Sequence, residues 1–333
     1  MITIVLDAMG SDDRPMPEVQ AAVIAANQLD VDILLVGDQN FLQTRLNELK
    51  GDKSRIHIVH APEALDMSDH IQEARAKKQN TMFVGMNLVK NNVGQAFVTA
   101  GNTGMAMYFA KKTLGDIPGV IRPCLCAVFP VKNGKCVVLD IGANAECRPE
   151  FLGQFAQMGL IYSKLMLGIK APRVGLLSNG EEEGKGSNLV RETFPILKKS
   201  IPNFIGNIEG KELFSGQVDV AVTDGFTGNI LLKSTEAVAK LIVETIRENL
   251  MASLRTKLGA LLAKPAFGAL KKMLDPAEIG AAPLLGIDGL VFVGHGRSDA
   301  KAMVSAIRTA KQAVETGLLE SLRLAIIKQT KGK

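Results

Sequence analysis

A chain of 333 residues with 47% apolar residues and 32 glycines is long enough to bury a substantial core, and its composition is that of an ordinary α/β enzyme. It contains no tryptophan and two tyrosines, so it offers few rings on which bases would stack, and no nucleic-acid partner is expected. The formal net charge of +5 permits an acidic partner without requiring one.

The sequence also lacks the features of a membrane-spanning or secreted protein. No apolar run reaches the roughly 18 residues that a span needs, and no basic, cleavable leader precedes the apolar segment 2–6. The cysteines at positions 124, 126, 136 and 147 lack metal-site spacing, so buried structural roles are expected, with no metal or other cofactor. These features predict a cytoplasmic protein.

Apolar strand segments alternate with helical segments, which predicts a mostly parallel, doubly wound sheet with helices on both faces. Strands are predicted at residues 1–6, 31–36, 56–59, 96–99, 174–177, 218–222 and 283–293. Helices are predicted at residues 17–28, 41–49, 71–78, 81–91, 105–114, 149–167, 188–199, 230–250, 299–316 and 318–328. An Asn133-Gly134 turn between residues 125–131 and 135–140 predicts an antiparallel hairpin within this series. Without a linker or repeat, residues 1–333 are expected to form a single domain.

Glycine-containing turns follow two strands in the first third of the chain. Asp7 ends the first strand and Gly10 lies in the loop after it, where open α/β sheets bind ligands. Asn102, Thr103 and Gly104 lie between the strand 96–99 and a helix, where main-chain N–H groups favour an anion. Capping of the next helix is the alternative role for Asp7, Asn102 and Thr103.

Two similar turns follow later strands. Asp140 and Asn144 end the second hairpin strand, where they line a cleft or merely satisfy the turn. Asp224, Gly228 and Asn229 follow the strand 218–222. Asn229 stands at the predicted start of a helix, where its amide would stabilise a developing oxyanion or cap the helix.

The glycine-rich loop 178–187 lies between the strand 174–177 and the helix 188–199, and in it Gly184 and Gly186 flank Lys185. Main-chain N–H groups, a helix N-terminus and a mobile positive charge together favour a phosphate-like anion. The alternative is a solvated surface loop in which the glutamates at 181–183 surround the lysine.

For each of three further features that contain basic or ionisable side chains, the sequence allows two roles. His295, in a glycine-flanked turn after the last strand, is a substrate contact or general base, or is structural. The basic residues 75, 77 and 78 bind an anionic partner or form a solvated face. Residues 251–274 contain basic side chains at 255, 257, 264, 271 and 272 and no acid.

Leucines at helical spacing in this last stretch predict a protruding basic amphipathic hairpin at about 249–276, suited to an anionic membrane or an acidic protein. The residues expected to enter the membrane are Leu254, Leu258, Leu261, Leu262 and Phe267. The alternative is an ordinary helix pair packed on a core or a dimer interface.

No nucleophile elbow, cysteine–histidine pair or metal constellation is present, so the chemistry must come from positioning and charge stabilisation. Attack of inorganic phosphate on an acyl thioester suits such a site, because phosphate is already an anionic nucleophile. Neighbouring corners of the sheet are expected to hold the phosphate about 3–3.5 Å from the carbonyl and to supply donors to the oxyanion.

The motifs together resemble the acyl-carrier-protein:phosphate acyltransferase family of bacterial phospholipid synthesis, over essentially the whole chain. The segments that carry the resemblance are 7–10 (DAMG), 100–104 (AGNTG), 139–144 (LDIGAN), 180–186 (GEEEGKG), 206–210 (GNIEG), 222–229 (VTDGFTGN) and 294–296 (GHG). The resemblance implies transfer of a long-chain acyl group from acyl carrier protein to inorganic phosphate. It also implies a homodimer, peripheral membrane contact and possible contact with the downstream glycerol-phosphate acyltransferase. The implied fold is a three-layer αβα sandwich similar to phosphotransacetylases and to isocitrate and isopropylmalate dehydrogenases.

On this basis Lys185 is expected to orient and neutralise phosphate, and Asn229 to bind the reacting carbonyl oxygen. The residues expected to bind substrate are Asp7, Gly10, Asn102, Thr103, Gly104, Asp140, Asn144, Gly184, Gly186, Asp224, Gly228 and His295. The sequence departs from the family pattern at Ser11, at Met105 and at 281–283 (AAP). A metal- and NAD-dependent dehydrogenase of related fold and a non-catalytic membrane-surface scaffold remain as alternatives.

Overall fold

The computed structural model describes residues 1–69, 71–265, 267–268 and 281–331. The strands are β1 (Ile2–Asp7), β2 (Val31–Gly37), β3 (Ile56–His60), β4 (Ala96–Thr99), β5 (Cys124–Val131), β6 (Gly134–Leu139), β7 (Val174–Leu177), β8 (Phe204–Ile208), β9 (Val220–Val222), β10 (Ala282–Leu285) and β11 (Leu290–Val293). The helices are α1 (Met16–Gln28), α2 (Gln39–Glu48), α3 (Ile71–Ala76), α4 (Thr81–Lys90), α5 (Thr103–Thr113), α6 (Pro149–Met166), α7 (Asn188–Ser200), α8 (Gly210–Ser215), α9 (Gly225–Met251), α10 (Leu254–Leu262), α13 (Ala300–Glu315) and α14 (Leu318–Lys331).

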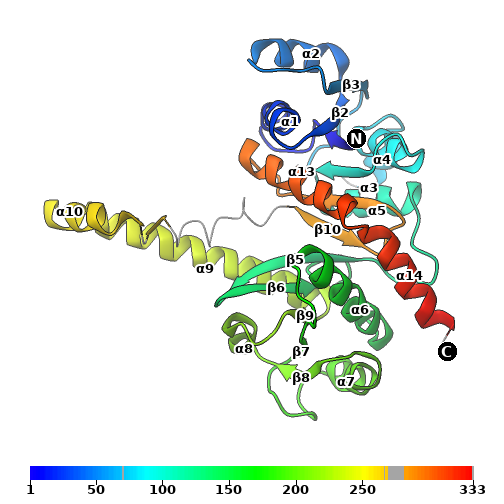
Figure 1. Cartoon of the computed structure of the whole chain (residues 1–333), viewed down its shortest axis with the longest axis vertical. Coiled ribbons are helices and arrows are strands. Elements are labelled where there is room, and N and C mark those ends of the chain that lie inside the picture. Colours follow the sequence, from blue (N-terminus) through cyan, green and yellow to red (C-terminus); the bar gives the residue numbers. More distant parts are fainter. Residues whose placement is uncertain (70, 266, 269–280, 332–333) are drawn as a thin grey trace.

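The described strands form one 11-stranded sheet in the order β3-β2-β1-β4-β11-β10-β5-β6-β9-β7-β8. The sheet runs along the long axis of the molecule, from β3 at the top to β8 at the bottom of Figure 1. The outer strands pair in parallel on both sides, while β11–β10, β10–β5 and β5–β6 pair antiparallel. This confirms a mostly parallel sheet with an antiparallel portion.

Side chains that alternate along the strands build a separate core on each face of the sheet. In β1, Ile4 and Leu6 enter the core beneath α1, α2, α6, α7, α13 and α14. Val5, between them, enters the core beneath α3, α4, α5 and α8. Because successive strand residues point to opposite faces, this pattern requires helices on both sides of the sheet. The result is the expected three-layer αβα sandwich.

Three antiparallel pairings in succession reverse the direction of the strands between the two halves of the sheet. β1, β4 and β11 run one way, and β6, β9, β7 and β8 run the other way. The parallel strands of each half therefore have their C-terminal ends at opposite edges. The glycine turns therefore divide between two opposite edges, because an odd number of reversals separates the two halves.

Two short elements, β8 and α8, were not expected, and the segment 283–293 is an antiparallel pair of strands, β10 and β11, rather than one strand. Helix α9 begins at Gly225, with Asp224 as its N-cap, so the expectation that Asn229 starts the helix is wrong. The glycines at 225 and 228 obscure the helix in the sequence. Both lie against main chain: a Cβ on Gly225 would come within 2.5 Å of the Asn144 carbonyl oxygen, and one on Gly228 would overlap the Asp140 carbonyl oxygen.

Helices α9 and α10 project from the body of the molecule (Figure 1). Of the hairpin expected at about 249–276, the described residues include α10, which a break at 252–253 separates from α9. The second arm, including residues 269–276, lies outside the described residues. None of the described helices is both long and apolar enough to cross a membrane.

Candidate active site

The expected site residues divide between the two edges of the sheet. Asp7, Asn102 and His295 follow β1, β4 and β11 and lie at what we call the Asp7 edge. Asp140, the α9 start and the Lys185 loop (residues 178–187) follow β6, β9 and β7 and lie at the Lys185 edge. Because β9 and β7 are neighbouring parallel strands, the segments that carry Asn229 and Lys185 leave the sheet side by side.

At the Lys185 edge, Asp140 organises a turn. Its buried carboxylate accepts hydrogen bonds from the main-chain N–H groups of Leu125 (3.0 Å), Gly142 (3.1 Å), Ala143 (3.0 Å) and Asn144 (2.7 Å), and from Asn144 Nδ2 (2.9 Å). Burial raises the pKa of Asp140, while these donors act in the opposite direction. Asn144 Nδ2 also donates to the Pro123 carbonyl at 2.8 Å. The two side chains thus satisfy the turn, which is one of the two roles expected for them.

Asp224 and Gly228 place Asn229 against this turn. Asp224 accepts hydrogen bonds from the Thr227 N–H (2.8 Å) and hydroxyl (2.9 Å) and so caps α9. The close approach at Gly228 brings Asn229 next to Gly142, whose Cβ position lies 3.7 Å from Asn229 Oδ1. Since Asn229 is not the cap, its exposed carboxamide is left without a hydrogen-bond partner within the described part of the chain.

The Lys185 loop is a compact turn before α7. The Lys185 N–H donates to the Glu182 carbonyl at 3.0 Å, and Ser187 caps α7 by accepting from the Val190 N–H at 3.3 Å. Gly184 and Gly186 flank Lys185, and Gly186 has a positive φ of 98° that favours glycine. Lys185 is exposed, and among the described residues its ammonium has no ion-pair or hydrogen-bond partner.

Glu181, at the start of this loop, belongs to a group of acids with Glu209 and Glu212 whose ligand atoms lie within 4.8 Å of one another. In the described part of the chain, no other group of three or more His, Cys, Asp or Glu ligand atoms is this close together. Lys211 Nζ lies 2.8, 3.2 and 3.5 Å from Glu181, Glu209 and Glu212 respectively, so a lysine supplies the cation. Its hydrogen bond lowers the pKa of Glu181.

At the Asp7 edge, Asp7 is buried and accepts hydrogen bonds from the Thr99 hydroxyl (2.7 Å) and the Met9 N–H (3.0 Å). Burial raises its pKa. Gly10 packs so tightly that a Cβ would lie 2.8 Å from the Gly101 nitrogen. The loops after β1 and β4 therefore pack directly against each other.

The Asn102 side chain caps α5 and also connects it to the segment that contains Met67. It accepts a hydrogen bond from the Met105 N–H at 3.1 Å, which caps α5 with Thr103 and Gly104 in its first turn, and it donates to the Met67 carbonyl at 3.2 Å. The capping role expected as one alternative is thus present.

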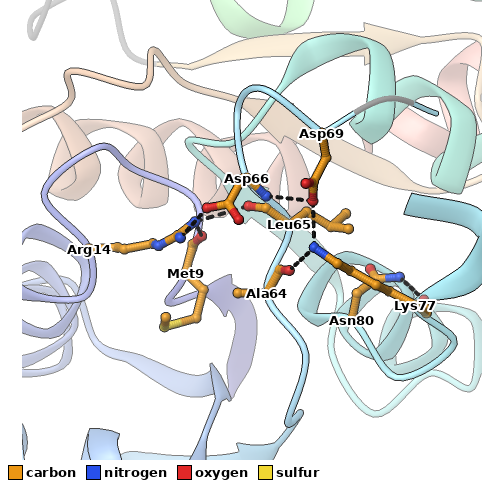
Figure 2. A network of polar contacts seen from close by, with 8 residues as sticks. All are labelled: Met9, Arg14, Ala64, Leu65, Asp66, Asp69, Lys77 and Asn80. Carbon is orange, nitrogen blue, oxygen red and sulfur yellow. Dashed lines mark hydrogen bonds and ion pairs between the residues drawn. The ribbon is translucent and has the colours of Figure 1, made fainter. Parts of the chain in front are cut away.

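The segment that contains Met67 is fixed beside the Asp7 edge by two cations (Figure 2). Arg14 donates to the Met9 and Leu65 carbonyls (3.2 and 3.0 Å) and pairs with Asp66 at 2.5 Å. Lys77 donates to the Ala64 carbonyl (2.9 Å) and pairs with Asp69 at 2.6 Å. Of the expected basic cluster, Lys77 is therefore paired internally, and Arg75 lies 4.8 Å over the Tyr108 ring.

His295 connects the Asp7 edge to the middle of α9. His295 Nε2 lies 3.2 Å from Glu236 Oε1, and this hydrogen bond is the main cause that lowers the pKa of Glu236. Asn229 and Glu236 are seven residues apart, about two helical turns, so they share one side of α9. Helix α9 thus spans from the Lys185 edge to the Asp7 edge.

Comparison with known proteins places the chain in a family. The model of the family described as "Fatty acid synthesis protein" matches residues 2–321. A phosphate acyltransferase of Elusimicrobium minutum is 45% identical over 96% of this chain and 94% of its own length. A phosphate acyltransferase of Thermus thermophilus is 46% identical over 96% of this chain and 97% of its own length. The chain belongs to the phosphate acyltransferase family.

Solved structures share the fold of this family member at low identity. A phosphotransacetylase from Streptococcus pyogenes has a TM-score of 0.63 at 16% identity, and the match covers 94% of each chain. A 4-hydroxythreonine-4-phosphate dehydrogenase from Klebsiella pneumoniae has a TM-score of 0.56 at 12% identity over 93% of this chain and 99% of its own length. The phosphotransacetylase-like fold is confirmed, and a dehydrogenase shares it.

The sequence departs from the family pattern at Ser11, at Met105 and at 281–283. In the structure these positions take part in the packing of the protein interior and of the sheet. Met105 is 2% exposed in the core beneath α4 and α5. Ala282 and Pro283 belong to β10, paired with β11. Ser11 is buried, and its N–H donates to Glu18 Oε1 at 2.8 Å.

Several residues that organise the two edges were missed by sequence reasoning, namely Arg14, Glu18, Asn207 and Glu236. Arg14, Glu18 and Glu236 stand in ordinary helix or loop contexts that carry no local signal. Asn207 lies in the GNIEG segment that contributes to the family resemblance, yet its partner is 25 residues away in the chain.

Proposed function

We propose that the chain transfers a long-chain acyl group from acyl carrier protein to inorganic phosphate and so supplies acyl phosphate for phosphatidic acid and phospholipid synthesis. Family membership supports an acyl transfer to phosphate. The observation that carries the assignment to this site is at the Lys185 edge. There Lys185 and Asn229 follow neighbouring parallel strands, and within the described residues neither side chain has a partner.

In this mechanism the Lys185 ammonium neutralises and orients phosphate, and the Asn229 carboxamide donates to the carbonyl oxygen. A phosphate oxygen attacks the thioester carbon, a tetrahedral oxyanion forms, and the carbonyl re-forms as the carbon–sulfur bond breaks. The sulfur leaves with the carrier protein as a thiolate. Positioning and hydrogen-bond donation to an oxyanion are each sufficient for large rate effects without a metal or covalent step.

The other expected substrate-binding residues take two roles in this proposal. At the Lys185 edge, Asp140, Asn144, Asp224 and Gly228 shape the corner that presents Asn229, while Gly184 and Gly186 present Lys185. At the Asp7 edge, the loops that carry Asp7, Gly10, Asn102 and His295 contribute a second surface, joined to the first through α9.

The decisive experiment is incubation of the protein with palmitoyl-acyl carrier protein and phosphate, followed by trapping with hydroxylamine. A palmitoyl hydroxamate that requires phosphate, carrier substrate and protein is the expected result. Its absence, together with binding of NAD and Mg²⁺ in equilibrium dialysis, would instead indicate the dehydrogenase alternative. Absence of any turnover with retained vesicle binding would indicate a scaffold.

We further propose that the protein is a homodimer that touches anionic membranes through α10, with possible contact to the downstream glycerol-phosphate acyltransferase there. Two surfaces support this. Helix α9 exposes apolar side chains, including Phe226 (62%) and Leu241 (63%). On α10, Leu254, Leu258, Leu261 and Leu262 are 86%, 63%, 66% and 78% exposed. Phe267, also expected at the membrane, is only half-buried.

A further inference from the structure

Among the contacts that the Lys185 loop receives from outside, one reaches the turn on which Lys185 stands through a buried side chain. The Glu182 carbonyl oxygen accepts two hydrogen bonds: from the Lys185 N–H at 3.0 Å, and from Asn207 Nδ2 at 2.8 Å. The first closes the turn on itself. The second joins the turn to β8, in which Asn207 is the residue before the last.

The Asn207 side chain acts here as a donor. Asn207 is 5% exposed, and its Oδ1 atom is buried without a hydrogen-bond partner among the described residues. Its Nδ2 bond to Glu182 is therefore the polar contact that this side chain makes. A hydrogen bond of this kind contributes about 1 kcal/mol net, and the burial of the Asn207 side chain partly shields it from competing water.

A second attachment acts one residue earlier and is weaker. Lys211 Nζ lies 2.8 Å from Glu181 Oε1, but the two side chains are 65% and 56% exposed. Exposed ion pairs contribute little and are screened by salt. Two further contacts are also exposed: Lys198 Nζ lies 3.1 Å from Glu183 Oε2, and Arg191 donates to the Gly186 carbonyl at 3.1 Å. Of these contacts, the one from Asn207 is made by a buried side chain, and we assign to it the main part in holding the loop in place.

The direction of the Lys185 side chain depends on this turn. A Cβ placed on Gly180 would lie 2.9 Å from Lys185 Cγ, so the lysine stem packs over the start of its own loop. A shift of the Glu182 carbonyl moves both the Lys185 N–H that is bonded to it and the stem that follows. Displacements of about 1 Å at a catalytic group can reduce rates by about a hundredfold.

We propose that Asn207 is the positioning residue for Lys185: it holds the Glu182 carbonyl, and thereby sets where the Lys185 ammonium meets phosphate. The proposal rests on the role of Lys185 in the proposed function. Asn207 itself does not touch substrate.

The test uses Asn207→Asp, which keeps the shape and removes the donor, in the full-length protein. Asn207→Ser removes the carboxamide without adding a charge, and it carries the test if the carboxylate prevents folding. The matched control is Asn27→Asp, because Asn27 Nδ2 also donates to main-chain carbonyls, of Val23 (2.7 Å) and Asp52 (2.9 Å), on the far half of the sheet.

Three readouts separate positioning from general destabilisation. Hydrogen–deuterium exchange of the amides in the Lys185 loop should accelerate about tenfold. The KM for phosphate should rise about fivefold or more, while the KM for acyl carrier protein substrate stays within about twofold. In the Lys185→Ala background, Asn207→Asp should cause no further loss of activity. The Asn27 variant should change none of these.

Unchanged exchange in both Asn207 variants would overturn the proposal whatever Lys185 contributes. Faster exchange with an unchanged KM for phosphate would overturn it as well, and so would a full further loss in the Lys185→Ala background. Full activity of Lys185→Ala would overturn the proposed function and this inference with it. The exchange data would still show separately whether Asn207 holds the loop.

Discussion

At the scale of single residues, the polar side chains of the two edges differ in whether they have hydrogen-bond partners within the described protein. Asp140 accepts from four main-chain N–H groups, and Asp224 and Asn102 cap helices. Lys185 and Asn229 have no such partners within the described chain. A side chain with unused donors beside a preformed turn is available to a substrate, which is why we assign the chemistry to these two.

Replacement of Lys185 by alanine should lower acyl phosphate formation more than about tenfold, because an uncompensated phosphate would face the acyl carbonyl without its counter-charge. The melting temperature should not change, since the Lys185 ammonium has no partner in the described structure. The hydroxamate assay measures the first effect. Lys170→Ala is the control, because Lys170 is an exposed lysine before β7 and so lies toward the opposite edge. Retention of more than about a tenth of the activity would count against this role.

Glu18 is expected to make the stability of the protein depend on pH. It is completely buried, and one of its carboxyl oxygens has no partner among the described residues. Burial raises its pKa from 4.5 to about 7. The unfolded chain therefore releases this proton near pH 4.5, whereas the folded protein retains it until about pH 7. The stability that this group contributes is fully present below pH 4.5 and is lost as the pH rises through about 7.

Glu18→Gln should therefore raise the free energy of unfolding at pH 8 by up to about 3 kcal/mol, the equivalent of the shift. Between pH 5 and 8, urea unfolding of the variant should show a shallower loss of stability than the parent. The carboxamide of the variant would keep an acceptor oxygen for the Ser11 N–H, in place of Glu18 Oε1. Identical pH slopes for variant and parent would remove Glu18 as the cause.

At the scale of elements, α10 combines leucines on one side with cations beside them. Leu254, Leu258 and Leu261 repeat at i, i+4 and i+7, and Arg255 and Lys257 are exposed next to them. In our proposal, a short helix of this kind would lie in the interface of an anionic membrane rather than across it.

Replacement of Leu258, Leu261 and Leu262 together by alanine should lower partition onto anionic vesicles at least about tenfold, because each buried leucine contributes about 1.5–3 kcal/mol. Cosedimentation with vesicles measures this. The control is Leu324→Ala with Ile327→Ala, two exposed apolar residues of α14 (52% and 40%) that should leave partition unchanged. Undiminished sedimentation of the triple variant would refute the membrane role of α10.

At the scale of the whole molecule, the reversed strand directions place the two groups of loops at opposite edges of the sheet, and one long helix connects these edges. Helix α9 begins against the Asp140 turn and reaches His295 through Glu236. Its outward side bears Phe226, Ile230 and Leu241, which are 62%, 50% and 63% exposed. An apolar stripe of this length on a helix, next to a candidate site, is typical of an interface between subunits.

Leu241→Asp should therefore shift the protein from dimer to monomer, because a charge would be buried without a partner in the interface. Analytical ultracentrifugation at micromolar concentration measures the mass. Leu324→Asp, on the other face of the sheet, is the matched control and should stay dimeric. A monomeric parent protein, or a dimeric Leu241 variant, would contradict the dimer on α9.

The sequence by itself determined most of the elements and the local features. Strand and helix periodicity, the Asn133-Gly134 hairpin turn, the Asn102 cap and the amphipathic α10 all depend on residues within a few positions of one another. The Lys185 loop was recognisable for the same reason. Only short-range geometry is needed to form these features, so they are visible in a sequence.

Tertiary structure alone decided which of these features meet. The reversal of strand direction, and with it the separation of Asp7 from Lys185, follows from pairings between strands far apart in the chain. The start of α9 was hidden because its glycines are required by contacts with the distant 140–144 turn. Burial of Glu18 and the bond from Asn207 to Glu182 likewise depend on neighbours that are remote in sequence. Desolvation and hydrogen bonding depend on distances in space, and the order of residues in a sequence does not give the distance between residues that are remote in the chain.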